Sequence, residues 1–122
     1  MKLPIIFQRL EAGLLFLASI YFYHHLHFNF FLFILLLLSF DIFMAGYLVS
    51  NKVGAFTYNL GHSLFLPLLV LIIGFAGDNR ILIGTSLIWF AHIGFDRALG
   101  YGLKFTTDFR DTHLGRIGKK KN

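Results

Sequence analysis

The sequence contains no cysteine, and charged residues make up only 14% of its 122 residues. The absence of cysteine excludes disulfide bonds and thiolate chemistry. Because 57% of the residues are hydrophobic, the chain has more apolar surface than one small soluble core could bury. The composition therefore predicts a protein that lives in a lipid bilayer.

Four apolar segments predict four transmembrane helices in a single domain over residues 1–122. The segments cover about residues 3–23, 28–49, 55–77 and 80–103, and a basic tail, 104–122, follows them. Each is close to the ~20 residues that a helix needs to cross ~30 Å of hydrocarbon. The links between them are short, so neighbouring helices must run antiparallel. We therefore expect an all-α fold, an antiparallel four-helix transmembrane bundle with a short cytoplasmic C-terminal tail.

The basic residues are distributed unequally between the two sides of this predicted bundle. If both termini share one side, Arg80 is the only lysine or arginine on the opposite side, and all the others in the links and tails lie on the side of the termini. The positive-inside rule then places both termini in the cytoplasm. Because this topology accounts for the net charge of +5, the lipid bilayer is the expected partner and nucleic acid is not. A homo-oligomer is compatible with the sequence.

Polar side chains within the predicted spans fall in the cytoplasmic half of the membrane. They include Arg9, Glu11, Asp41, Asn59, His62, His92, Asp96 and Arg97. His92 lies four residues before Asp96, so the two share a helix face. Since an ionised side chain in mid-membrane costs ~3 kcal/mol on insertion scales, these groups are expected to face one another or water. The sequence predicts a polar cluster inside the bundle.

The cluster has the residue types of a metal site. The candidate ligands are His62, His92, Asp96 and Asp41. Imidazole nitrogens with carboxylate oxygens suit zinc or a similar divalent ion, and such an ion can generate hydroxide from bound water. Glu11 is then a candidate general base, and Arg97 is a candidate clamp for a phosphate or carboxylate. The predicted substrate is lipid-like and reaches the cytoplasmic interface.

Two other interpretations of the cluster remain open. Its polar groups can be structural, joined by hydrogen bonds and ion pairs in a non-enzymatic scaffold or accessory subunit. They can also serve a small transporter or channel. Further candidate members of the cluster are Tyr101 at the end of the last span and, if the tail folds back, Lys104, Asp108, Asp111 and His113. Otherwise they form a polar cap at the interface.

Several stretches of the chain are similar to a known family. They read "FQRLEAGLLFLAS", "DIFMAGYLVSNKVGAFTYNLGHSLFLPLL", "WFAHIGFDRALGYGLKF" and "FRDTHLGRIG". Together they resemble the bacterial integral membrane family called domain of unknown function 4260. The resemblance implies a small four-helix protein of the bacterial inner membrane, and it does not indicate which activity the protein has.

A weaker similarity concerns the arrangement of the histidines. "GHSLFLPLL" followed by "HIGFDRALGYG" is similar in layout to the THSL and HxxxD elements of membrane-bound metal-dependent hydrolases. That similarity implies His62, His92 and Asp96 as ligands. The chain departs from the pattern at Gly61, which stands where those hydrolases have threonine.

Overall fold

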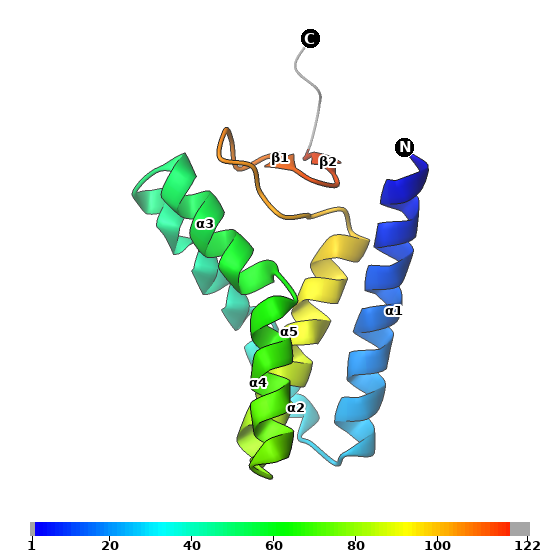
Figure 1. The fold of residues 1–122 in the computed structure, drawn as a ribbon. Helices are drawn as coiled ribbons and strands as arrows, with labels where there is room; N and C mark the ends of the chain where they lie inside the picture. Colours follow the sequence, from blue (N-terminus) through cyan, green and yellow to red (C-terminus); the bar gives the residue numbers. More distant parts are fainter. Residues whose placement is uncertain (1, 118–122) are drawn as a thin grey trace.

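A computed structural model of the protein describes residues 2–117, and these are mostly helical (Figure 1). The elements in chain order are α1 (Leu3–His25), α2 (Phe30–Leu37), the 3₁₀ helix η1 (Ser39–Leu48), α3 (Asn51–His62), α4 (Phe65–Ala76), α5 (Arg80–Ala98), β1 (Asp111–Thr112) and β2 (Gly115–Arg116). The two short strands pair antiparallel. The three lysines 119–121 of the predicted basic tail lie outside the described residues.

Three helical stretches of the described chain are long and apolar enough to cross a membrane: Leu3–His25, Phe30–Leu48 and Asn51–Ala76. Helix α5 is not among them, because polar residues and glycines interrupt its apolar sequence. It is instead the central helix of the bundle, packed against α1, α4 and α2. Every residue from Ser86 to Gly94 is buried. The predicted all-α membrane fold with four helical segments is confirmed, with the least apolar segment in the middle.

The hydrophobic core lies at the end of the bundle where α1 turns into α2. Tyr23 of α1, Phe33 of α2 and Ile88 of α5 are buried together there. The Tyr23 hydroxyl donates to the Asn29 carbonyl at 2.5 Å, and the Asn29 side chain caps α2 by accepting from two backbone N–H groups. The apolar end of the bundle is therefore closed by packing and by a capped turn.

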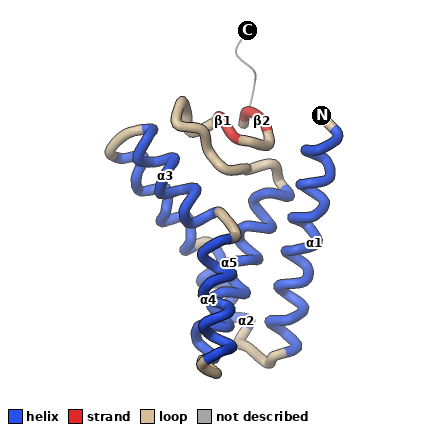
Figure 2. The backbone as a smooth tube through the Cα atoms, in the orientation of Figure 1, coloured by secondary structure: helices blue, strands red, loops and turns tan. Residues whose placement is uncertain are grey.

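The prediction of a single third helix over residues 55–77 is wrong, because the structure has two helices there, α3 and α4. Helix α3 begins earlier, at Asn51, because Ser50 caps it by accepting from the Val53 N–H at 3.1 Å. It ends at His62, and α4 continues in a different direction after a break (Figure 2). Pro67 is the physical reason: it has no N–H for the carbonyl four residues earlier, and its ring would clash with that carbonyl.

The second and fourth predicted helices also need correction. The second changes from α to 3₁₀ geometry after Leu37, and the 3₁₀ segment of ten residues is unusually long. Helix α5 ends at Ala98 instead of continuing to residue 103. It ends there because Gly100 has φ +97°, a left-handed conformation that continues no right-handed helix and that glycine adopts at no steric cost.

A glycine face on α3 lets η1 lie directly against it. A Cβ added at Gly54 would fall 2.2 Å from the Tyr47 ring, and one added at Gly61 would fall 2.2 Å from the Phe43 ring. The two glycines are seven residues apart and thus share a helix face. The aromatic rings of η1 therefore rest on bare α3 backbone, which holds η1 and α3 together as a hairpin. Figure 1 shows this hairpin diverging from α1.

The segment 99–117 folds back across the open end of the bundle, between α3 and the start of α1 (Figures 1 and 2). The Asn59 side chain holds it by two hydrogen bonds to one residue: Nδ2 donates to the Lys104 carbonyl at 2.8 Å, and Oδ1 accepts from the Lys104 N–H at 2.5 Å. The start of α1 and the end of the described chain thus lie at the same end of the bundle, as an even number of crossings requires.

Candidate metal centre

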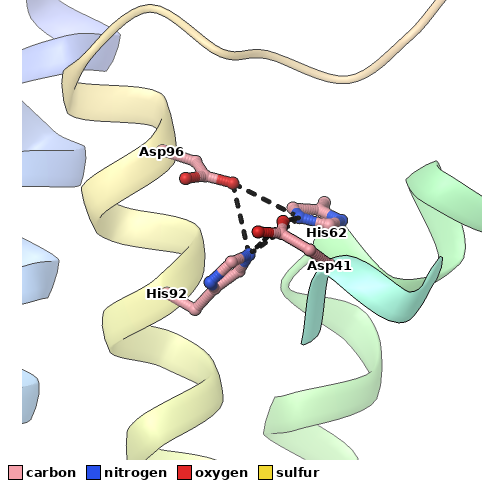
Figure 3. Close-up of side chains that lie close together, drawn as sticks. All are labelled: Asp41, His62, His92 and Asp96. Atoms are coloured by element: carbon pink, nitrogen blue, oxygen red, sulfur yellow. Dashed lines mark hydrogen bonds and ion pairs between the residues drawn. The ribbon is translucent and has the colours of Figure 1, made fainter. Parts of the chain in front are cut away.

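Four side chains from three separate elements meet at the point where the α3–η1 hairpin joins α5 (Figure 3). They are Asp41 of η1, His62 at the end of α3, and His92 and Asp96 of α5. The two Nε2 atoms are 2.9 Å apart. Asp96 Oδ2 lies 3.3 Å from His62 Nε2 and 3.2 Å from His92 Nε2. Asp41 Oδ1 lies 3.7 Å and 3.3 Å from the same two nitrogens.

These separations match the corners of a small tetrahedron. Zinc binds nitrogen and oxygen at about 2.0–2.2 Å, and a regular tetrahedron of that size has edges of about 3.3–3.6 Å. The five distances above run from 2.9 to 3.7 Å, and all four donor atoms lie within 4.8 Å of one another. The group could hold a metal ion with little movement of its side chains.

The backbone sets the orientation of both imidazole rings. His62 Nδ1 lies 3.0 Å from the Tyr58 carbonyl, and His92 Nδ1 lies 2.6 Å from the Leu37 carbonyl. A carbonyl can only accept, so each Nδ1 must carry the hydrogen and donate it. In a neutral ring, Nε2 then presents its lone pair to the cluster. A histidine that donates its other nitrogen to a carbonyl is the usual arrangement of a metal ligand.

As a consequence, negative electrostatic potential accumulates at the centre of the cluster, and no positive charge balances it. With both rings neutral, four lone-pair-bearing atoms converge and no hydrogen lies between them. His62 is 3% exposed and His92 is 1% exposed, so water does not surround these rings. Buried acceptors that face only acceptors are costly, and a cation or added protons must compensate them. The donor set therefore fits a divalent cation.

Side chains of α5 bind the backbone carbonyls that are freed at the two helix breaks beside the site. Backbone at membrane depth loses its helical partners where a helix stops, and the freed groups need new donors. Trp89 Nε1 donates to the Gly61 carbonyl at 2.6 Å, and Arg97 Nη2 donates to the His62 carbonyl at 3.2 Å. His92 does the same for the carbonyl at the end of α2. Side chains of α5 thus satisfy both breaks.

Aromatic rings pack against both histidines and limit their movement. The Tyr58 ring stacks on His62 with centroids 3.9 Å apart and an interplanar angle of 5°. Phe40 lies beside His92 and stacks on Trp89. These ring contacts were not predicted from the sequence. One signal was present for Tyr58, because it precedes His62 by four residues and so lies on the same helix face.

The four candidate ligands differ in exposure. The Asp96 side chain is largely buried, like the two histidines, whereas the Asp41 side chain is 45% exposed. Asp41 is also carried by the 3₁₀ segment and makes the longest of the distances above, 3.7 Å. Solvent therefore reaches the cluster at the Asp41 corner.

Lys104 extends the ring stack outward from the site. Its Nζ lies 4.7 Å from the centre of the Tyr58 ring and 4.0 Å from the centre of the Phe109 ring. Within the described residues the buried Nζ makes no hydrogen bond, so these cation–π contacts hold it. Burial lowers the pKa of Lys104 to about 8, and the negative charge of Asp96 acts in the opposite direction.

The predicted catalytic pair lies beside the cluster and does not belong to it. Glu11 of α1 and Arg97 of α5 line a cleft of about 260 Å³. The remaining lining residues are Gln8, Ala12, Leu15, Leu64 and His113. The cleft is bounded by α1, the break between α3 and α4, the end of α5, and the folded-back tail.

The other predicted members of the cluster have different partners. Arg9 Nε donates to the Ala98 carbonyl at 2.9 Å, and Tyr101 is exposed. Asp108 accepts from the Arg110 N–H at 2.8 Å. Asp111 accepts from Thr107 and pairs with Arg116. The tail carboxylates therefore serve the tail's own fold, and Asp41 and Asp96 are the carboxylates of the cluster.

Comparison with known proteins gives a family match. A family model described as Domain of unknown function (DUF4260) matches residues 5–117. No curated protein and no solved structure matches the chain. The match confirms the family resemblance over nearly the whole chain, and its description names no activity. The weaker similarity to membrane-bound hydrolases stays a prediction.

Proposed function

The chain belongs to the DUF4260 family, and from the geometry of its site we propose that it is a membrane-embedded, metal-assisted hydrolase or transferase. The metal is a divalent ion such as zinc, held by the buried His62, His92 and Asp96, with the exposed Asp41 as a fourth ligand that water or substrate can displace. The substrate is lipid-like and approaches from the cytoplasmic leaflet of the inner membrane, with both termini of the chain in the cytoplasm. The supporting observation is the convergence of four possible ligand atoms within 4.8 Å of one another, with the Nδ1 atom of each histidine held by a backbone carbonyl.

The unequal exposure of the ligands favours a catalytic over a purely structural metal. Structural zinc sites are closed by four protein ligands, whereas catalytic sites have three and leave one position for water or substrate. Here His62, His92 and Asp96 are the buried ligands, and Asp41 is the exposed one. An ion in this position supplies a polarised water or a polarised substrate oxygen. We assign the Asp41 corner as the position where water or substrate enters.

Arg97 supports a substrate that carries an anionic group. Arg97 lines the cleft, follows the ligand Asp96 in sequence, and donates a hydrogen bond to the backbone carbonyl of the ligand His62. A guanidinium is suited to phosphate and carboxylate. Its role is to orient the anionic part of the substrate beside the metal.

Elemental analysis of the purified protein tests the metal. We expect close to one divalent ion per chain, lost in His62→Gln and in His92→Gln. His25→Gln is the matched control, because His25 is an exposed histidine of α1 and its loss should leave the metal content unchanged. Circular dichroism and gel filtration in detergent show whether each variant is folded. Folded wild-type protein without stoichiometric metal would contradict the proposal.

Asp41→Asn tests whether the three buried ligands are sufficient to hold the ion. Three buried ligands should still hold the ion, with weaker affinity, so the variant is expected to load with metal at a higher concentration than the wild type.

An activity assay separates a catalytic from a structural metal. In lipid nanodiscs, metal-loaded wild-type protein should convert a component of a bacterial lipid extract, as measured by mass spectrometry, and a chelator should stop the conversion. A loaded protein that converts no lipid would leave a structural centre of a scaffold protein as the better explanation.

A further inference from the structure

We infer that the cleft between α1, α5 and the tail binds the headgroup of a zwitterionic phospholipid, with its phosphate on Arg97 and its ammonium group on Glu11. As an assignment of substrate class this rests on the proposed function, whereas the binding itself does not depend on the metal. It gives Glu11 a binding role in place of the general-base role predicted from the sequence.

The first support is a pair of opposite charges that face one cleft without meeting. Arg97 and Glu11 both line it. No ion pair joins either of them to another side chain within residues 2–117. The Arg97 Nε is buried and makes no hydrogen bond there. A cation near the membrane interior needs a counter-charge, and a ligand with charges of both signs can satisfy both side chains at once.

The second support is the change of polarity along α1. Gln8 and Glu11 lie toward the start of the helix, and Ala12 and Leu15 lie farther into the bundle on the same cleft. Leu64 adds an apolar side chain from the break between α3 and α4. The lining therefore runs from polar at the level of the headgroups to apolar at the level of the acyl chains, as an amphiphile requires.

His113 completes the polar end of the cleft. Its Nδ1 accepts from the Leu103 N–H at 2.8 Å, so the neutral ring carries its hydrogen on Nε2. The ring can therefore donate a hydrogen bond without adding charge. The cleft volume of about 260 Å³ lies below the ~300–1,000 Å³ that is usual for pockets of drug-sized ligands. A headgroup fits this space, and its acyl chains would remain in the bilayer.

A comparison of two phospholipids tests the inference. Wild-type protein in mixed micelles is offered phosphatidylethanolamine and phosphatidylglycerol with identical acyl chains, and the retained lipid is measured by native mass spectrometry. The first has a phosphate and an ammonium group, whereas the second has no ammonium group. Because Glu11 is exposed, we expect a modest preference for phosphatidylethanolamine, about fivefold. In Glu11→Gln the two lipids should be retained about equally.

Control variants separate a specific contact from a general effect of charge. Asp78→Asn also removes one carboxylate, but at the opposite end of the bundle, and it should leave the preference unchanged. Arg97→Gln should weaken retention of both lipids. Glycerophosphoethanolamine, which has the headgroup and no acyl chains, distinguishes a lipid site from a site for soluble phosphate compounds: it should compete only weakly.

Two outcomes would overturn the inference. One is equal retention of the two lipids by the wild type, and the other is an unchanged preference in Glu11→Gln. Strong competition by the soluble compound would also overturn the lipid assignment. The measurement is repeated after treatment with a chelator, and retention should persist. A metal-free protein that keeps the lipid preference would contradict the proposed function alone, and a metal-loaded protein without preference would contradict this inference alone.

Discussion

Replacing Asn59 by alanine should release the tail from the bundle. The Asn59 side chain makes two hydrogen bonds to the Lys104 backbone, at 2.8 and 2.5 Å. A net hydrogen bond is worth about 0.5–1.5 kcal/mol. The pair should therefore contribute about 1–3 kcal/mol to docking, which corresponds to a change of about 5- to 150-fold in the docking equilibrium.

Hydrogen exchange of the Lys104 amide measures this change in detergent. The amide donates to Asn59, so it exchanges when the tail undocks, and its exchange rate in Asn59→Ala should rise by that factor. The amides of α5 from Ser86 to Gly94 should keep their rates, because they lie inside the bundle. An increase at all positions would indicate general destabilisation.

Asn51→Ala is the matched control. Asn51 is the same residue type on the same helix and also bonds the tail, but through one exposed contact of 3.2 Å to the Thr107 carbonyl. An exposed bond of this kind contributes little, and we expect a change below about threefold. If Lys104 exchanges equally fast in Asn59→Ala and in the wild type, the paired hydrogen bonds do not hold the tail and the reasoning is refuted.

Three further predictions concern the bundle and its pH dependence. Gly94→Ala should destabilise the bundle by about 1–3 kcal/mol in detergent unfolding, because the new Cβ would lie 2.7 Å from backbone of α1; Gly13→Ala, with its nearest neighbour at 3.9 Å, should be tolerated, and equal effects would contradict this packing. Trp89→Phe leaves the Gly61 carbonyl without its donor and should cost about 1–3 kcal/mol, so an unchanged melting temperature would show that the break does not need it. Burial, followed by the charge of Arg97, lowers the pKa of His113 from its usual 6.5. Tail docking should therefore be complete above pH 6.5 and weaken as the pH falls through the lower folded-state pKa. In His113→Gln, the protection of the Lys104 amide, corrected for the intrinsic pH dependence of exchange, should no longer fall in acid.

The candidate ligands could be selected from the sequence for a thermodynamic reason. Ionisable groups are rare in an apolar chain and costly in lipid. Asp41, His62, His92 and Asp96 were therefore expected to lie together inside the bundle. Helical spacing placed His92 and Asp96 on one face. It could not reveal that the Leu37 carbonyl orients His92, because these residues are far apart in sequence and the carbonyl is freed only where α2 changes to 3₁₀ geometry.

The helix breaks divide in the same way. Pro67 is a local signal, and it could have predicted the end of α3 near His62. The 3₁₀ segment has no such signal, because its geometry depends on rings that rest on the glycine face of α3. The sequence predicted Asn59 as a member of the polar cluster, but its hydrogen-bond partner is backbone of the tail, 45 residues away.

The sequence by itself determined that this chain is helical, belongs in a membrane, and carries most of the ionisable groups of its helices toward one end of the bundle. Composition and periodicity suffice for this, because the cost of polar groups in hydrocarbon acts on each residue separately. Only the tertiary structure decided which nitrogens face the centre of the cluster, which carboxylate stays exposed, and that Glu11 and Arg97 share a different cleft. These features depend on carbonyls and rings from separate elements, whose positions follow from the packing of whole helices.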